Sequence, residues 1–290
     1  MKGAIDAQIA ANDGLNLLYE HIDDIARVDE HFVDAFKDIR SNPPAEVEKL
    51  ISYTVEKTIS KIYEINQFLH VTPALRGELF AIYKETWRKF DPDRSLPIMR
   101  DHHRRLSEWV GKLYPPRFVE ILRSSERIGK VINEQYSVLF QIKVLGLNIK
   151  EIAEPIIDIG CGPHGGLVRY LYNRGKNVYG IDRTIKSKDS RLKQADWLEF
   201  EFKRRHYGTI IANMSFSNHF VFHLQHQTES RDQYFNKFGE ILESLSPGGM
   251  FVYAPAVPEI EARVDLHKYS FESTEINSGG TVTKIHRFAG

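Results

Sequence analysis

Short β-rich runs alternate with helical stretches through the second half of the chain, and this pattern restricts the fold most. The β-rich runs are PIIDIG, NVYGID, TIIANM and GGMFVYAP, and the helical stretches between them include LVRYLYNRG and residues 232–245. Strands that alternate with helices are typical of a parallel sheet with crossover helices. We therefore predict an α/β domain over residues 151–290.

The first half has a different texture. Only six of the 19 glycines lie in residues 1–150, and the apolar residues recur there at three- and four-residue spacing, as in amphipathic helices. One such stripe runs from Leu18 to Phe36, and Thr72-Pro73 provides an N-cap and a first-turn proline. We predict helices at 17–39, 45–68, 73–90, 97–112 and 117–145, and hence an all-helical N-terminal domain over residues 1–150.

Charge and cysteine content exclude several classes of function. The 290 residues carry 39 basic and 39 acidic side chains, so no overall field favours nucleic acid or an anionic membrane. No run approaches the ~18 apolar residues of a membrane-spanning helix, and the first residues lack the apolar core of a signal peptide. Cys161 is the only cysteine, which excludes an intrachain disulfide and a thiolate metal cluster. We expect a cytoplasmic protein without a metal.

An apolar strand runs into a glycine-rich turn between residues 156 and 166. The sequence there is IIDIGCGPHGG, and a helical stretch starts at Leu167. Glycine lets the backbone approach a ligand closely, because no Cβ stands in the way. Alone this turn is a weak signal, since other strand-to-helix corners use glycine for its positive φ. Its interpretation as a nucleoside-binding corner depends on the neighbouring strands.

Acidic residues follow on the next two predicted strands. Asp182 ends the strand at 178–182, where a ribose diol would meet a bidentate carboxylate. Asp196 precedes Trp197, so the pair offers an acceptor for an adenine amino group and a ring to pack on its face. Each residue also has a structural alternative: Asp158 can bond the turn amides, Asp182 can cap the next turn, and Trp197 can belong to the core.

The order of these motifs resembles the class I S-adenosylmethionine-dependent methyltransferases. The resemblance rests on IIDIGCGPHGG, VYGID, QADWL, TIIANMSFSN and LSPGGMFVY and covers about half of the chain, from Glu154 onward. It implies a Rossmann-like sheet of seven strands, the last antiparallel, with S-adenosylmethionine across the C-terminal ends of strands one to four. The residues carried over are Asp158, Gly160 and Gly162 for the methionine moiety, Asp182 for the ribose, and Asp196 with Trp197 for the adenine.

A nicotinamide dinucleotide is the competing ligand for such a corner. The spacing departs from G-x-G-x-x-G, because residue 163 is proline and the next glycines are Gly165 and Gly166. The acidic Asp158 would also sit poorly beside a pyrophosphate. Both features favour S-adenosylmethionine.

In the fold implied by the resemblance, residues 213–219 face the sulfonium of the cofactor. This segment carries hydrogen-bonding groups and no carboxylate. Asn213 and Ser215 are candidates to orient a substrate amine or the cofactor's amino group, and His219 is a candidate general base. Tyr136, on the helix before the first strand, is a candidate of the helical half, which would act as a lid. His219, His223 and His226 recur at helical spacing, but without a Cys or acidic partner a surface helix is the better interpretation than zinc.

Three functions remain open at this point. The first is methyl transfer to a small molecule by in-line displacement, in which positioning does most of the catalysis. The second keeps the cofactor but releases methylthioadenosine, by cyclisation to azetidine-2-carboxylate or by aminobutyryl transfer as in nicotianamine synthases. The third is a non-catalytic ligand-binding scaffold. Nucleic acid is an unfavoured substrate, since Asn-Met-Ser-Phe at 213–216 replaces the Asn-Pro-Pro-Tyr of base methyltransferases. The oligomeric state is left open.

Overall fold

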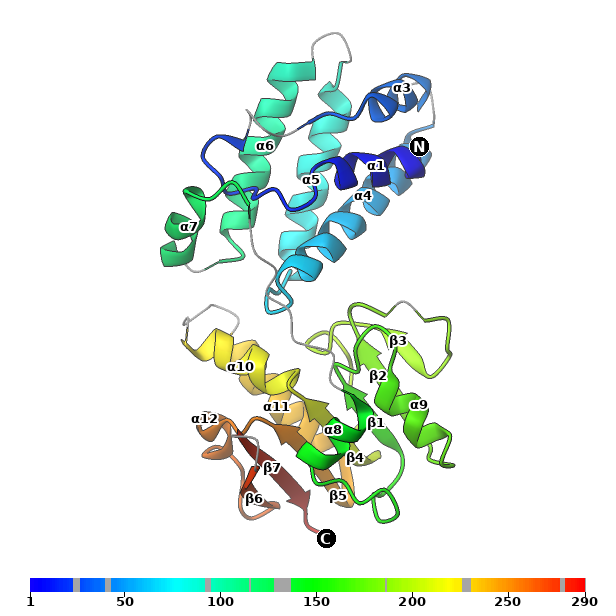
Figure 1. Cartoon of the computed structure of the whole chain (residues 1–290), viewed down its shortest axis with the longest axis vertical. Helices are drawn as coiled ribbons and strands as arrows, with labels where there is room; N and C mark the ends of the chain where they lie inside the picture. The colour runs from blue at the N-terminus through cyan, green and yellow to red at the C-terminus, as the bar shows by residue number, and fades with distance from the viewer. Residues whose placement is uncertain are drawn as a thin grey trace. The chain divides into compact units, whose positions relative to one another are not determined.

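The chain forms two compact units, Met1–Ile132 and Asn133–Gly290 (Figure 1). The computed structural model describes residues 1–22, 27–39, 43–91, 95–114, 116–127, 137–185, 187–225, 231–276 and 280–289. We refer to the two parts as the helical unit and the α/β unit. The division falls before residue 150 because α8 (Val138–Val144) contributes Val144 to a buried cluster with α9 (Gly166–Tyr172) and β1 (Ile156–Ile159).

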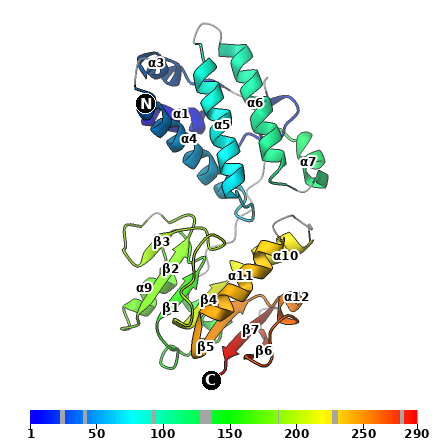
Figure 2. The same cartoon turned by 180° about the vertical axis from the view of Figure 1, so that it is seen from behind.

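The helical unit is built around three long helices. In Figure 2, α5 (Pro73–Lys89) lies between α4 (Pro44–Ile65) and α6 (Ser95–Gly111). The shorter α1 (Lys2–Ala11) packs against α4 and α3 (Glu30–Ile39), and α7 (Pro116–Arg123) follows α6. The predicted start of α5 is confirmed, because Thr72 Oγ1 accepts a hydrogen bond from the Leu75 amide and proline opens the helix.

Two predicted helices are corrected. The stripe from Leu18 to Phe36 is not one helix, because residues 27–29 are not helical and Asp29 Oδ1 caps α3 by accepting from the Phe32 amide. The helix predicted at 117–145 ends at Arg123. Asn16 Nδ2 donates to the carbonyls of Leu122 and Ser125 at 2.7 and 2.8 Å, which satisfies the end of α7 from a distant part of the chain.

The α/β unit contains a seven-stranded sheet in the order β3-β2-β1-β4-β5-β7-β6. Its further strands are β2 (Val178–Asp182), β3 (Leu192–Gln194), β4 (Tyr207–Asn213), β5 (Leu245–Ala254), β6 (Tyr269–Ile276) and β7 (Gly280–Arg287). Strands β1 to β5 are parallel to their neighbours, whereas β7 is antiparallel to both β5 and β6. The prediction of seven strands with the last antiparallel is therefore confirmed.

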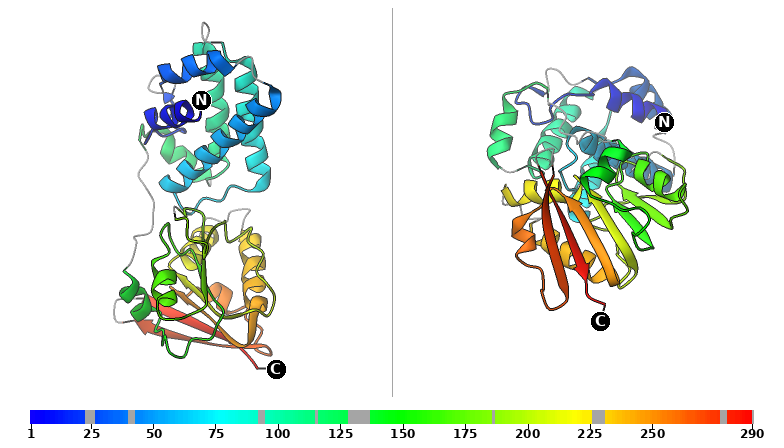
Figure 3. Two further views of the ribbon diagram at one scale, coloured as in Figure 1. Left: turned by 90° about the vertical axis from the view of Figure 1, so that its right-hand side faces the viewer. Right: turned by 60° about the horizontal axis from the view of Figure 1, so that its bottom comes forward.

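Helices cover both faces of this sheet (Figure 3). On one face, α8 and α9 pack over a cluster that includes Ile156, Ile211 and Val252. On the other, α10 (Phe216–Gln225) and α11 (Arg231–Ser244) pack over a cluster that includes Ile157 and Ile210. Successive residues of a strand thus alternate between the two clusters, as the period of two requires. In the sequence, the short α12 (Pro258–Glu261) comes between β5 and β6.

Over the described ranges, no helix is long and apolar enough to span a bilayer.

Candidate functional site

The glycine-rich turn after β1 is fastened to the end of β4. Gly160 has a φ of +72°, and a Cβ at this position would lie 2.2 Å from Cβ of Ser215. The hydroxyl of Ser215 donates to the carbonyl of Ile159 at 2.5 Å. Only glycine fits position 160, because any other residue would meet both a left-handed backbone and Ser215.

The same turn is tied to β2 through Gly162. Its φ is +74°, and no atom lies within 4 Å of the place where a Cβ would stand. Its amide donates to Oδ2 of Asp182 at 3.0 Å. Glycine tolerates this positive φ and leaves open space beside the backbone. Such space lets a ligand lie close to the chain.

Two turns hold Asp182 in place, the glycine-rich turn after β1 and the turn that follows β2. Besides the Gly162 amide on Oδ2, its Oδ1 accepts from the amide and the hydroxyl of Thr184 at 2.7 and 2.6 Å. The carboxylate therefore does cap the next turn, as the structural alternative expected. An ionised carboxylate has about four acceptor sites, so this one keeps capacity for a further donor.

Asp158 is the most unusual carboxyl group of the unit. Its side chain is 2% exposed, and Oδ2 has no hydrogen-bond partner among the described residues. Burial, and next the charge of Asp182, raise the pKa of Asp158 to about 8. A carboxyl group that merely tied the turn amides would accept hydrogen bonds from them, so its structural alternative does not account for this oxygen.

A second buried oxygen without a partner lies at the end of β4. Within the described residues, Asn213 Oδ1 accepts no hydrogen bond. Asp158 pairs in register with Ile211, and Asn213 is two residues further along β4. Strand alternation therefore puts Asp158 and Asn213 on the face of the sheet that α8 and α9 cover. The same alternation along β2, where Val178 belongs to that cluster, puts Asp182 there too.

Two features of the β4–α10 turn have no signal in the sequence. Met214 has a φ of +59°, a left-handed conformation that is uncommon outside glycine and often marks functional turns. Ser217 is fully buried, and its Oγ lacks a hydrogen-bond partner in the part of the chain that is described. Ser215 was a candidate from the sequence. Ser217 was not, because its residue type alone gives no sign of a buried hydroxyl without a partner.

The residues predicted to hold the adenine differ in environment. Asp196 Oδ1 accepts from the amide of Leu198 at 3.0 Å, and Oδ2 lies 3.6 Å from Nη1 of Arg183. Trp197 is 4% exposed and packs its ring against Phe216 and Tyr234 in the core. Trp197 thus has the core role that was its alternative, and its contact with adenine stays a prediction.

His219 belongs to the same aromatic core. It is 6% exposed, its ring lies edge-on to Trp197, and its Nδ1 is 3.4 Å from the hydroxyl of Tyr234. His223 stacks on the Tyr234 ring, with centroids 4.4 Å apart. A role of His219 as general base stays a prediction. Tyr136 and His226 lie outside the described residues.

Among the described residues, no group of three or more His, Cys, Asp or Glu side chains could hold a metal ion.

Comparison with known proteins adds distant structural likenesses. No family model matches the sequence, and no curated protein matches it. A methyltransferase of Methanosarcina mazei shares 13% identity, covering 47% of this chain and 92% of its own, at a TM-score of 0.31. One from Mesorhizobium loti also shares 13%, covering 48% and 95%, at 0.32. A phosphoethanolamine N-methyltransferase of Haemonchus contortus shares 15%, covering 53% and 52%, at 0.31.

At these identities and scores, the fold assignment rests on the chain's own strand order. Five parallel strands, a crossover at β1–β4 and an antiparallel β7 inserted between β5 and β6 are present. The α/β unit has the Rossmann-like fold of class I S-adenosylmethionine-dependent methyltransferases.

Proposed function

We propose that the α/β unit binds S-adenosylmethionine at the C-terminal ends of β1, β2 and β4, and that the protein uses it to methylate a small molecule. The observation that carries the proposal is the pair of buried oxygens without partners, Asp158 Oδ2 and Asn213 Oδ1, on one face of adjacent strands. Buried acceptors of this kind are costly unless a ligand supplies donors.

The charge of the site favours a cation. Asp158 is buried, and the carboxylate of Asp182 is near enough to raise its pKa. A ligand with a positive ammonium or sulfonium group relieves both the repulsion and the desolvation. S-adenosylmethionine carries both groups, whereas the pyrophosphate of a dinucleotide would add negative charge.

The site residues would bind three parts of the cofactor: the methionine moiety, the ribose and the adenine. Asp158 and Asn213 would accept from the amino group of the methionine moiety, beside the space at Gly162. Asp182 would accept from the ribose with its remaining capacity, and Asp196 from the adenine amino group. Because these groups sit on strand ends, their positions are fixed before the ligand arrives.

Ser215 has a restricted chemical role. Its hydroxyl hydrogen is used in the bond to the Ile159 carbonyl, so Oγ can accept a hydrogen bond from a substrate amine but has no proton to donate. The cofactor supplies an activated methyl group when bound. The chain's part is to bind and orient the cofactor and the acceptor and to keep water away. These tasks require no carboxylate in residues 213–219, and the segment carries none.

A small acceptor is favoured over nucleic acid by charge. The chain has a formal net charge of zero, and residues 213–216 read Asn-Met-Ser-Phe. The net charge thus supplies no overall attraction for a nucleic acid, and the Asn-Pro-Pro-Tyr motif of base methyltransferases does not stand at these positions.

Calorimetric titration and product analysis test the proposal together. The full chain should bind S-adenosylmethionine, and S-adenosylhomocysteine should form only when a small-molecule acceptor is added. Methylthioadenosine formed from the cofactor alone would replace methyl transfer by cyclisation or aminobutyryl transfer. Binding without any turnover across amine, thiol and hydroxyl acceptors would leave a ligand-binding scaffold.

A matched pair of variants makes the binding test specific to the site. Asp158→Asn removes the buried carboxyl group, whereas Asp265→Asn removes a carboxylate that precedes β6 and pairs with Lys268. Only the first should weaken cofactor binding. Equal affinity in all three proteins would contradict the proposed site.

A further inference from the structure

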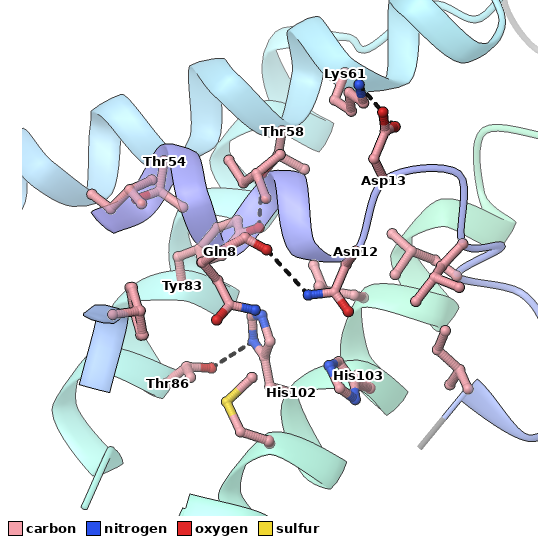
Figure 4. A pocket seen from close by; sticks show the side chains of 18 of the residues that line it. Gln8, Asn12, Asp13, Thr54, Thr58, Lys61, Tyr83, Thr86, His102 and His103 are labelled. Atoms are coloured by element: carbon pink, nitrogen blue, oxygen red, sulfur yellow. Dashed lines mark hydrogen bonds and ion pairs between the residues drawn. The ribbon is translucent and has the colours of Figure 1, made fainter. Parts of the chain in front are cut away.

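The helical unit contains a partly open apolar cavity (Figure 4). Its volume is about 170 Å³, similar to the about 150 Å³ of an engineered apolar cavity that admits benzene. Every residue that lines it lies between Ile5 and Leu106, on or next to α1, α3, α4, α5 and α6. The space is therefore large enough for one aromatic ring.

Aromatic side chains form much of the wall. The ring of Phe36 lies 4.6 Å from that of Phe90 and 5.3 Å from that of Trp87, both in edge-to-face arrangements. Phe32 contacts the same cluster. An apolar wall with ring edges and faces favours a flat aromatic guest over a flexible or strongly hydrated one.

Most polar side chains of the cavity already have partners. Gln8 and Asn12 bind the backbone of Arg27 and Asp29, and Lys61 pairs with Asp13 at 2.8 Å. These contacts leave the described lining without an unpaired charge, which disfavours a charged guest.

A second polar contact links α4 to α5. The hydroxyls of Thr58 and Tyr83 lie 2.8 Å apart, and Figure 4 shows them on the wall of the cavity. Because each satisfies the other, neither requires a ligand.

His102 is the exception, and its hydrogen bonds define its tautomer. Thr86 Oγ1 donates its only hydrogen to the carbonyl of Ile82 at 3.0 Å. Both Thr86 contacts are hydrogen bonds only when the imidazole donates the one of 2.8 Å between His102 Nδ1 and Thr86 Oγ1. In that arrangement Nδ1 carries the hydrogen, and Nε2 carries a lone pair.

The remaining nitrogen, Nε2, belongs to a residue that lines the cavity. His102 is 6% exposed, and burial, followed by the neighbouring His103, lowers its pKa to about 3, so the ring is neutral. Within the described residues, Nε2 receives no hydrogen bond. Figure 4 shows the His102 ring among the lining side chains, with its contact to Thr86.

We propose that this cavity binds a small, uncharged, single-ring aromatic molecule that donates one hydrogen bond, from a hydroxyl or ring N–H, to Nε2 of His102. The volume sets the single ring, the aromatic wall sets its flat shape, and the lone pair on Nε2 sets the donor. All residues of the site belong to the helical unit.

Phenol and toluene, titrated into the full-length protein, test the donor directly. The two probes match in shape, and only phenol has a hydroxyl. Phenol should bind about fivefold to tenfold more tightly, as one buried hydrogen bond implies. Benzoate should not bind, since its charge would enter unpaired. Equal affinity for phenol and toluene would overturn the hydrogen bond to His102, and no binding of either at millimolar concentration would show a packing void only.

Variants assign the preference to His102. His102→Phe keeps a ring and removes both nitrogens, so phenol and toluene should bind it equally. Thr86→Val removes the acceptor of Nδ1 and should reduce the preference only in part, because the tautomer is then free to exchange. His31→Phe, at an exposed histidine of the same unit, should leave the preference unchanged. A preference that survives in His102→Phe would assign the donor contact elsewhere and overturn the proposal.

A spectroscopic readout does not depend on any variant folding. Imidazole nitrogen chemical shifts of His102 in the unmodified protein should identify Nδ1–H, and phenol should shift the Nε2 resonance more than toluene does. An Nε2–H tautomer in the free protein would contradict the proposal. Binding of S-adenosylmethionine, measured on the same samples, should be unchanged in His102→Phe, which separates this site from the proposed function.

Discussion

The two units treat buried polar groups in different ways. At the ends of β1 and β4, Asp158 and Asn213 keep buried oxygens without partners among the described residues. In the helical cavity, hydroxyls such as those of Thr58 and Tyr83 bond one another, and Nε2 of His102 offers a lone pair in the proposed tautomer. The first arrangement suits a cationic ligand with several donors, and the second suits a neutral guest with one. Unpaired groups thus indicate the chemistry of a ligand better than a cavity's size does.

The largest effect is expected at the turn that holds the first arrangement together. Gly160→Ala puts a Cβ 2.2 Å from Ser215 on a backbone with positive φ, and should lower the free energy of unfolding by about 4 kcal/mol. Gly162→Ala has the same backbone angle but open space, and should cost only about 1 kcal/mol. Chemical denaturation of both variants checks this. Similar losses would mean that Ser215 does not restrict position 160.

The next effect concerns the carboxylate between the turns. Asp182→Ala should weaken S-adenosylmethionine binding by roughly 1 to 3 kcal/mol, because it removes the ribose acceptor and releases the Gly162 amide. Thr184→Val removes one donor to Asp182 and leaves the carboxylate in place, so it should change the affinity much less. Calorimetry compares the two. An unchanged affinity in Asp182→Ala would refute the assignment to the ribose.

One substitution in each unit, with different expected effects on the free energy of unfolding, would sharpen the contrast between the units. Asp158→Asn removes a buried carboxyl group without a partner on Oδ2, and should leave the ligand-free protein as stable as before or about 1 kcal/mol more stable at pH 8. Thr58→Val leaves the buried hydroxyl of Tyr83 unpaired, and should cost about 1 to 2 kcal/mol. Thermal and denaturant unfolding measure both. Destabilisation by both variants would mean that Asp158 is paired in solution.

The smallest effect is a dependence on pH. The pKa of Asp158 is about 8 when folded and ordinary when unfolded, so this group stabilises the ligand-free protein at low pH. That contribution is lost as the pH rises from about 4 to 8. A cationic ligand favours the ionised form, so binding at pH 7 should release a proton.

Calorimetry in two buffers of different ionisation enthalpy counts this proton. The affinity for S-adenosylmethionine should rise a few-fold between pH 7 and pH 8, and Asp158→Asn should abolish both the release and the rise. Proton release that persists in Asp158→Asn would assign the titration to another group.

Local patterns sufficed to predict β1, β2, β4, β5 and the start of α5. These four strands contain the apolar runs, and Thr72-Pro73 is a self-contained helix start. The other three strands are rich in polar residues, so the count of seven depended on the resemblance to a known family. The end of α7 was not predictable in this way, because Asn16, far away in the sequence, satisfies its carbonyls. The break before α3 depends on the cap that Asp29 provides. Asp29 lies within the apolar stripe, so its presence did not indicate that the predicted helix would be interrupted there.

The candidate site was predictable by residue type and less so by environment. Asp182 and Asn213 were identified because they end predicted strands, which meet at one edge of a parallel sheet. Asp158 lies inside β1 and was identified from the resemblance to a known family. The burial of Trp197 and His219 depends on contacts with Tyr234 on α11, which the sequence near those residues does not contain. The unpaired Ser217 hydroxyl likewise depends on packing around α10.

The contact between Gly160 and Ser215 also restricts how such a chain can diverge. A side chain at position 160 becomes sterically acceptable only after position 215 has lost its own, and that loss also removes the hydrogen bond to Ile159. Related sequences that change one position should therefore change the other. The permitted order is the loss at 215 first, because the reverse order passes through an overcrowded intermediate.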